Sequence, residues 1–266
     1  MKFLLAILLF VSSQVSAQTG SYLLYDYELD TTQVSYNMNE VRSIASITKL
    51  FTAITILRSG EDLREKVKIT GKSGGRFVRG SKVERMDLMR AMLISSDNLA
   101  AETLANTYPG GFKKYIQDVN EYAQGMGFVN TKLVDATGLL PGNVSTAKEL
   151  TTFLWKIKDN VVIRWFANER HDYIEIPKGK KSVKIKLNNT NPSLFVFDNI
   201  LISKTGFTNA AGRCVVMLVE KNKKLHGIVI LGQKNVRDRS EIAKDLILLE
   251  NLVKPEEEPI EFAFPL

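Results

Sequence analysis

The hydrophobic pattern of residues 42–57, RSIASITKLFTAITIL, predicts a helix with one apolar face. Its apolar residues recur every three or four positions, at Ile47, Leu50, Ile54 and Leu57. Before this segment, residues 21–38 contain two runs rich in β-branched and aromatic residues, a pattern that predicts a β-hairpin. After it, residues 66–80 indicate a strand followed by a Gly-rich loop.

Helical patterns dominate the middle of the chain. Residues 86–125 contain three helical runs. Pro109–Gly111 lies between the second and the third, and Gly125–Gly127 ends the third. Thr146 then predicts the N-cap of a further helix, and Glu149 stands at the position that completes a capping box.

Strand-like runs return from Tyr173 onward. NILISK, RCVVMLVE and LHGIVIL predict an antiparallel meander, and residues 239–253 have the pattern of a closing amphipathic helix. We therefore predict an α/β (α+β) sandwich, in which an antiparallel sheet built from both chain ends is flanked by helices. An all-helical region of about residues 86–170 would be inserted into this domain, which spans residues 18–252.

The two ends of the chain predict an exported protein. Residues 1–17, MKFLLAILLFVSSQVSA, have the charged start, short apolar run and small-residue cleavage site of a signal peptide. The nine apolar residues Phe3–Val11 are too few to span a bilayer. Residues 253–266 form a short acidic tail with proline interruptions, so no membrane anchor is expected. These features predict a periplasmic or otherwise exported protein that is soluble after cleavage.

Composition and charge narrow the function classes. The chain has 266 residues, 44% of them hydrophobic, and a single cysteine, Cys214, so no intramolecular disulfide can form. The net charge is +7, but the basic residues form no stripe interleaved with aromatic residues, and we expect no nucleic-acid partner. An acidic polymer of the cell envelope is the more plausible partner.

Three short motifs carry the candidate chemistry. Ser46 and Lys49 stand three residues apart on the predicted helix and share one face of it. Ser96-Asp97-Asn98 falls between two helical runs, and Lys204-Thr205-Gly206 ends a predicted strand. S-x-x-K alone is common in helices, where a serine cap and a solvated lysine explain it. S-x-x-K, S-D-N and K-T-G in this order are typical of penicillin-binding proteins and class A β-lactamases.

The residue types of these motifs suit acyl transfer. A serine hydroxyl needs a base within hydrogen-bond reach to attack an amide, and burial can depress the pKa of Lys49 enough for that task. Ser96 can relay the proton to the leaving nitrogen, while Asn98 can hold both Lys49 and a substrate amide.

The K-T-G motif suits substrate binding. The charge of Lys204 attracts a substrate carboxylate, and the Thr205 hydroxyl can donate a hydrogen bond. Gly206 has no side chain and lets a substrate approach the strand edge closely.

The chain as a whole resembles the low-molecular-mass penicillin-binding proteins of the serine D-alanyl-D-alanine peptidase family. IASITKL, YPGGF, NVSTAKELT and KTGFTNAAG are similar to the D-Ala-D-Ala endopeptidase branch, often called penicillin-binding protein 7. The resemblance implies Ser46 as the acylated nucleophile, Lys49 as proton acceptor and Lys204 as substrate anchor. It also implies an oxyanion hole formed by the backbone N–H groups of Ser46 and Phe207.

The resemblance further implies an activity and partners. The protein would cleave D-alanyl peptide bonds in peptidoglycan stem peptides, preferably in crosslinks, and β-lactam antibiotics would acylate it as covalent inhibitors. Two alternatives stay open: a D-Ala-D-Ala carboxypeptidase acting on pentapeptide tails, and a non-catalytic penicillin- or peptidoglycan-binding module. A β-lactamase is disfavoured because residues 122–148 contain no glutamate to activate a deacylating water.

Other candidate site residues are assigned structural roles. With two histidines and one cysteine, the chain offers few ligands for a catalytic zinc site, and no metal or cofactor is expected. His171 is interpreted as an isolated surface residue. Relatives that act on free C-terminal carboxylates carry an arginine soon after the strand that follows K-T-G. Here Gln233 and Lys234 stand at the positions where that arginine is sought first. The sequence assigns the role to neither Arg237 nor Arg239, and it leaves open that one of them folds back to fill it.

Overall fold

The computed structural model describes residues 20–179 and 181–249. The predicted signal segment, residue 180 and the predicted C-terminal tail lie outside the described residues. Within the described part, the elements follow in the order β1 (Ser21–Asp26), β2 (Thr31–Tyr36), β3 (Arg42–Ser43), η1 (Ala45–Ile47), α2 (Thr48–Arg58), β4 (Lys66–Lys68), β5 (Lys82–Glu84), α3 (Arg85–Ile94), α4 (Asn98–Asn106), α5 (Gly111–Gly125), β6 (Val144–Ser145), α6 (Ala147–Ile157), α7 (Val161–Asn168), β7 (His171–Lys178), β8 (Lys181–Asn188), η2 (Pro192–Phe195), β9 (Ile200–Thr208), β10 (Gly212–Lys221), β11 (Lys224–Gln233) and α8 (Val236–Leu249).

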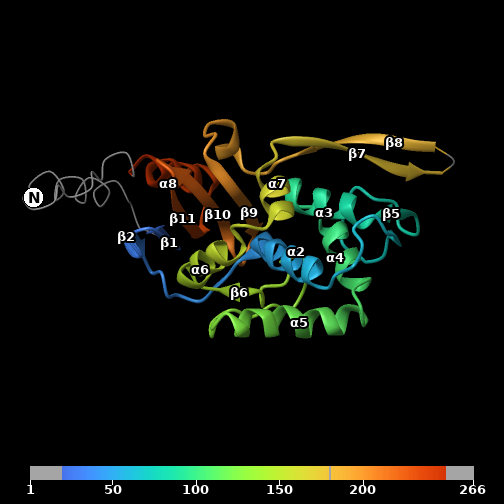
Figure 1. Ribbon diagram of the computed structural model, residues 1–266, viewed down its shortest axis with the longest axis horizontal. Helices are drawn as coiled ribbons and strands as arrows, with labels where there is room; N and C mark the ends of the chain where they lie inside the picture. The colour runs from blue at the N-terminus through green and yellow to red at the C-terminus, as the bar shows by residue number, and fades with distance from the viewer. Residues whose placement is uncertain (1–19, 180, 250–266) are drawn as a thin grey trace, which may run out of the picture.

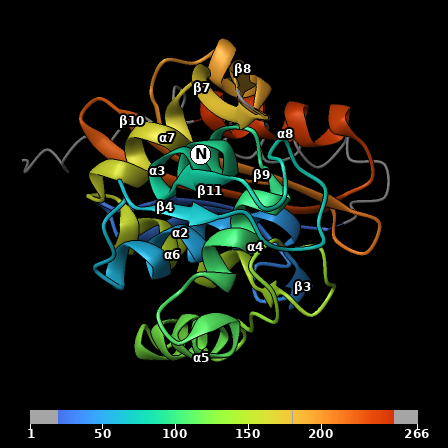
Figure 2. The ribbon, with the colours of Figure 1, turned by 90° about the vertical axis from the view of Figure 1, so that its right-hand side faces the viewer.

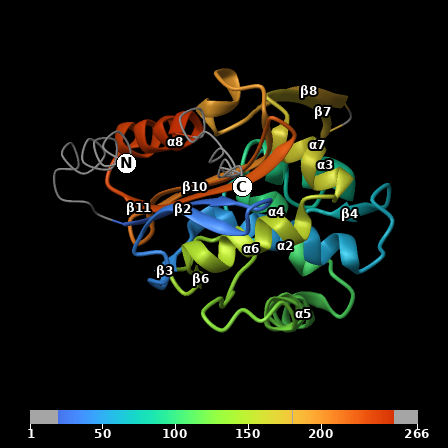
Figure 3. The same ribbon diagram turned by 60° about the vertical axis from the view of Figure 1, so that its left-hand side comes forward.

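A five-stranded antiparallel sheet joins the two ends of the chain. Its strand order is β2-β1-β11-β10-β9, so the N-terminal hairpin pairs with the last strand of the C-terminal meander. The predicted sheet and its construction from both chain ends are confirmed. Strand β9 lies at one edge, where it has a neighbour on one side only. Helix α8 covers one face of the sheet and α6 the other (Figure 3).

The pattern of β10 shows why the sheet is covered on both faces. Successive side chains of a strand point to opposite faces, and here both sets are apolar. Cys214, Val216 and Leu218 join the core shared with the helical region, whereas Val215 and Met217 join the core beneath α8. Cys214 is fully buried and unpaired, as its place in an apolar strand predicted.

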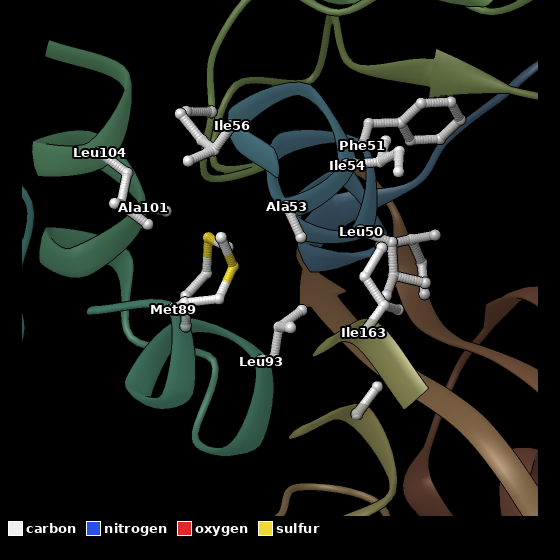
Figure 4. Packing of buried hydrophobic residues seen from close by; sticks show 14 of the residues in the cluster. Leu50, Phe51, Ala53, Ile54, Ile56, Met89, Leu93, Ala101, Leu104 and Ile163 are labelled. Atoms are coloured by element: carbon white, nitrogen blue, oxygen red, sulfur yellow. The ribbon is translucent and has the colours of Figure 1, made fainter. Parts of the chain in front are cut away.

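Helix α2 forms the centre of the helical region. It is buried from Thr48 to Ile56, and helices α3, α4, α5 and α7 contact it. Met89 and Leu93 of α3 and Ala101 of α4 point toward this helix (Figure 4). On its other side, Phe51 stacks on Phe153 of α6 with ring centroids 3.8 Å apart. This packing holds the start of α2 against the sheet.

Two hairpins stand apart from the main sheet. Strands β4 and β5 pair with each other, as do β7 and β8. The β7–β8 ribbon lies over α3, and its tip extends past the rest of the helical region (Figures 1 and 2). The strand-like pattern after Tyr173 predicted strands here, but it did not predict that they form a separate ribbon. No helix in the described part of the chain is long and apolar enough to cross a bilayer.

The cap of α6 differs in part from its prediction. Thr146 caps this helix as predicted, since its Oγ1 accepts a hydrogen bond from the Glu149 N–H at 3.1 Å. The Glu149 carboxylate does not complete the capping box. It accepts hydrogen bonds from the N–H groups of Val129 and Asn130 and from the Thr131 hydroxyl instead. A neighbouring loop with free donors therefore competes successfully for this side chain.

Candidate active site

Ser46 and Lys49 lie side by side where the first turn of the central helix meets β9. Ser46 belongs to η1, and Lys49 follows one turn later in α2. The Lys49 side chain is fully buried, and its Nζ lies 2.8 Å from Ser46 Oγ. Ser46 is only partly buried, so its hydroxyl faces both the buried amine and the surface. This is the contact that the S-x-x-K spacing predicted.

The Lys49 amine has two further partners. It donates to Asn98 Oδ1 at 2.7 Å and to the Thr137 carbonyl oxygen at 2.6 Å. Burial lowers its pKa to about 7, although the carboxylates of Asp135 and Asp97 oppose this shift. A lysine with such a pKa is neutral in a large fraction of molecules near pH 7 and can accept a proton.

The S-D-N motif forms the turn between α3 and α4. Ser96 has a left-handed backbone with φ 56°, and Asn98 begins α4. Asp97 caps this helix through the Ala100 N–H at 2.9 Å and also accepts the Arg76 N–H at 2.8 Å. The motif thus brings Asn98 to Lys49. The Ser96 hydroxyl makes no hydrogen bond to any residue that the structure describes.

The K-T-G motif lies on the edge strand β9 beside Ser46. The Lys204 side chain is buried, and Nζ donates to the Thr205 carbonyl at 3.1 Å. Burial, together with the charges of Lys49 and Arg239, holds the pKa of Lys204 well below its usual range. Thr205 Oγ1 shares a 2.6 Å hydrogen bond with Thr190 Oγ1.

Gly206 and Phe207 complete this strand. A Cβ atom at Gly206 would lie 2.9 Å from the Ser46 amide nitrogen, so only glycine lets β9 approach the serine this closely. The Phe207 side chain is 47% exposed, and the Arg213 guanidinium stacks over its ring. The two residues whose N–H groups were predicted to form an oxyanion hole therefore belong to adjoining segments.

The loop of residues 135–143 supplies a part of the site that the sequence reasoning missed. Asp135 accepts hydrogen bonds from the N–H groups of Thr137 and Gly138, each at 2.6 Å, and of Leu140 at 2.8 Å. These bonds fix the carbonyl of Thr137 toward Lys49. Asn143 shapes the same turn, because its Oδ1 accepts hydrogen bonds from the N–H groups of Val134 and Asp135. An Asp two residues before a Thr-Gly pair was the available sequence signal.

Arg239 is one of the two arginines whose role the sequence left open. It lies in α8, is 6% exposed, and its charge acts on Lys204. Of the two, it is therefore the arginine whose charge reaches the K-T-G motif. Arg237 is exposed and pairs with Glu241. The two arginines differ because α8 packs on the sheet, and one helix face is buried while the other is solvated.

The histidines lie away from this constellation. His171 is exposed at the start of the β7–β8 ribbon, as interpreted from the sequence. His226 is buried on β11, where its Nε2 lies 3.4 Å from Asp26 Oδ2. Within the described residues, no group of His, Cys, Asp and Glu side chains has an arrangement that could hold a metal ion.

Fold and site together define a protein in which a partly buried serine hydroxyl has a fully buried lysine amine as its partner. The chain matches the D-alanyl-D-alanine carboxypeptidase family over residues 9–235 and belongs to that family. It is therefore a serine-type peptidase, a hydrolase. The family expected from the three motifs is confirmed.

Relatives of known name agree with this assignment. The chain is 37% identical to a D-alanyl-D-alanine endopeptidase of Escherichia coli over 83% of this chain and 73% of that protein. It is 35% identical to a D-alanyl-D-alanine endopeptidase of Pseudomonas aeruginosa, over 82% of this chain and 72% of that protein.

Solved structures show the same fold. The Streptomyces K15 DD-transpeptidase superposes with a TM-score of 0.82 at 22% identity, over 88% of this chain and 97% of that chain. Penicillin-binding protein D2 of Listeria monocytogenes, in its cefotaxime-bound form, has a TM-score of 0.74 at 25% identity, over 86% of this chain and 95% of that chain. The predicted α+β sandwich with its helical region is confirmed.

Proposed function

We propose that this protein is a serine D,D-peptidase that hydrolyses D-alanyl peptide bonds of peptidoglycan through an acyl-enzyme on Ser46. One observation carries the proposal above all. The fully buried Lys49 amine, with its pKa lowered to about 7, lies 2.8 Å from the Ser46 hydroxyl. This arrangement supplies the base that a serine needs to attack an amide.

The first half-reaction forms the acyl-enzyme. Neutral Lys49 takes the Ser46 proton as Oγ bonds to the carbonyl carbon of the scissile peptide. The N–H groups of Ser46 and Phe207 would stabilise the negative charge on the carbonyl oxygen. The C–N bond then breaks, and the proton passes from Lys49 through the Ser96 hydroxyl to the leaving amine. In the second half-reaction, Lys49 takes a proton from water as the water oxygen bonds to the acyl carbon, the C–Oγ bond breaks, and that proton passes to Ser46 Oγ.

Substrate would bind along the free edge of β9. An edge strand offers unpaired backbone groups to an extended peptide, and Gly206 removes any side chain at the approach to Ser46. Asn98 would hold the substrate amide, and the Thr205 hydroxyl would donate to it. Lys204 would attract a carboxylate of the substrate, because its own charge is otherwise poorly solvated.

We propose crosslinked peptides as the preferred substrate. The support comes from the relatives in Escherichia coli and Pseudomonas aeruginosa, both named D-alanyl-D-alanine endopeptidases. A carboxypeptidase acting on pentapeptide tails is the second candidate. Its support is the charge of Arg239, which acts on Lys204 and would add to the positive potential that meets a free terminal carboxylate. No particular observation favours a non-catalytic binding module.

β-Lactams would acylate the same serine, and the sequence supports an exported location. The cefotaxime-bound form of the Listeria relative supports β-lactam binding in this fold. Residues 1–17 support export to the periplasm, with cleavage near Ala17.

Two experiments test the proposal. After incubation with a β-lactam, the peptide that contains Ser46 should gain the drug's mass, and Ser46→Ala should abolish the adduct. Labelling of another serine would refute the assignment. In competition, purified crosslinked dimers should be split faster than monomeric pentapeptides lose terminal D-alanine. Rapid D-alanine release with intact dimers would instead establish the carboxypeptidase.

A further inference from the structure

The β7–β8 ribbon carries a concentration of positive charge that the proposed chemistry does not use. Residues 171–188 contain five lysines and two acidic residues. The apolar side chains of Ile174, Ile176 and Leu187 are buried toward the body. The described lysines of the ribbon are all exposed, namely Lys178, Lys181, Lys184 and Lys186.

None of these lysines forms an ion pair within the described residues, although Lys184 lies opposite Glu175 in the register. The two acidic side chains of the ribbon are otherwise engaged: Asp172 pairs with Arg90, and Glu175 accepts a hydrogen bond from Ser182. At the tip, Lys178 lies directly opposite Lys181 in the antiparallel register. Like charges at such positions destabilise a hairpin, so the fold itself gives no reason for this pair.

The neighbouring β4–β5 hairpin repeats the arrangement. It contacts the ribbon through β5, and its Lys68 lies opposite Lys82. The hairpin and its loop expose Lys66, Lys68, Lys72, Arg76, Arg79 and Lys82. Two adjoining hairpins thus each place a pair of lysines face to face. We call these two hairpins, residues 66–84 and 171–188, the basic arm.

The basic arm begins at the wall of the candidate active site. Ser95, which precedes the S-D-N serine, exchanges two hydrogen bonds of 3.0 Å with the backbone of Asn188 at the end of β8. Two residues later, Thr190 bonds to Thr205 of the K-T-G motif. An eight-residue strand spans roughly 26 Å, so the ribbon leads away from this base by about that distance.

We propose that the basic arm binds the carboxylates of polymeric peptidoglycan, the wall material whose peptides enter the site. The inference rests on the proposed function, because it takes peptidoglycan as the substrate. Stem peptides carry free carboxylates, and in the polymer many of them lie beside any scissile bond. An arm that starts between two catalytic motifs and is positive along its length complements such a substrate. A small soluble peptide bound in the active site would not reach along the arm.

A membrane surface fits the arm less well. The ribbon's exposed Tyr173 is covered by the Lys184 amine, 4.8 Å from the ring centroid, and its other exposed large apolar residue is Val183. Binding to a lipid interface generally needs an apolar face that enters the headgroup region. The arm provides charge without such a face.

The test compares two sets of four substitutions with the same change in charge. The arm variant combines Lys178→Gln, Lys181→Gln, Lys184→Gln and Lys186→Gln. The control combines Lys113→Gln, Lys148→Gln, Lys156→Gln and Lys223→Gln, which are exposed on other faces. Each protein is assayed for cosedimentation with purified sacculi, for release of peptides from sacculi, and for cleavage of a soluble crosslinked dimer.

At low ionic strength the arm variant should bind and digest sacculi at least ~10-fold less well than the wild type. The binding of the arm variant to sacculi should also fall less steeply as salt is added, because fewer charge contacts remain for the salt to screen. The rate at which the arm variant cleaves the soluble dimer should stay within about twofold of the wild-type rate, since long-range attraction between the arm and the polymer does not contribute to this reaction. The control should behave like the wild type in all three assays.

Several results would overturn the inference. Equal losses in both variants, or equal losses on sacculi and on soluble dimer, would remove any specific role for the arm. Binding to phosphatidylglycerol vesicles is measured as well. If the arm variant still binds sacculi but no longer binds the vesicles that the wild type binds, the arm is assigned to a membrane. If the wild type binds sacculi but neither cleaves the dimer nor releases D-alanine from pentapeptides, the proposed function fails while the cosedimentation assay still tests the arm.

Discussion

Gly138 packs directly against Ala45, so that a Cβ atom at position 138 would lie 1.9 Å from the Ala45 carbonyl oxygen. Gly206 approaches the same stretch of backbone, at the Ser46 amide. Two glycines from distant parts of the chain therefore border the peptide that positions the nucleophile. Backbone atoms cannot move aside as a flexible side chain can, so these contacts are sensitive to any added atom.

Gly138→Ala should destabilise the protein by at least ~2 kcal/mol, because the clash adds to the strain of a left-handed residue. Gly127→Ala is the matched control. Both glycines have φ +81°, but a Cβ atom added at position 127 would meet no atom within 4 Å. The control should lose only about 1–2 kcal/mol. Urea unfolding measures both, and equal losses would show that the contact with Ala45 is unimportant.

The rate of acylation by a β-lactam should rise with pH and level off above about 7. The buried Lys49 amine, whose pKa is lowered to about 7, must lose its proton before it can act as a base. Below that pH the rate should fall tenfold per unit. Lys49→Arg should lower the rate by at least ~10²-fold, since guanidinium stays protonated. Stopped-flow acylation from pH 5 to 9 provides the measurement, and a flat profile would argue against a neutral base.

Asp135→Asn should shift that pH profile to lower pH. The Asp135 carboxylate raises the pKa of Lys49, so removing its charge should lower this pKa further. The amide would also turn a donor toward one of the loop N–H groups, at a cost of roughly 1–3 kcal/mol in stability. Asp159→Asn, at an exposed site, should change neither quantity. An unshifted profile would mean that the carboxylate does not act on Lys49.

Lys204→Gln should weaken acylation by β-lactams that carry a carboxylate by about ten- to 150-fold, the loss expected for a charge-assisted contact of roughly 1.5–3 kcal/mol. An analogue without the carboxylate should react almost normally. Comparing kcat/KM for the two compounds separates the roles. If both reactions slow equally, Lys204 instead tunes Lys49, whose charge it opposes.

Cys214 should resist thiol reagents in the folded protein. Its side chain is fully buried, and burial raises the pKa of the thiol to about 11, so little reactive thiolate forms near pH 8. Modification by a disulfide reagent should become rapid only after unfolding in denaturant. Fast labelling of native protein would mean that β10 opens far more readily than a central strand of the sheet should.

Local patterns were enough to predict most of the regular structure and the catalytic motifs. The helix at residues 48–58, the N-terminal hairpin and the C-terminal meander each follow from a period of apolar residues, which neighbouring positions alone determine. The contact between Ser46 and Lys49 also follows from helical spacing. The meeting of three motifs was inferred from family resemblance, and the structure brings together Lys49, Asn98 and the K-T-G strand.

Only the tertiary structure decided the side-chain contacts between residues that are far apart in the sequence. The Thr137 carbonyl reaches Lys49 because Asp135 gathers the loop around it, and no periodicity encodes that contact. Arg239 rather than Arg237 lies near Lys204 because packing of α8 on the sheet determines which helix face is buried. Glu149 bonds to a loop instead of completing a capping box. In each case the sequence offers a side chain several possible partners, and only the packed fold determines which partner is within reach.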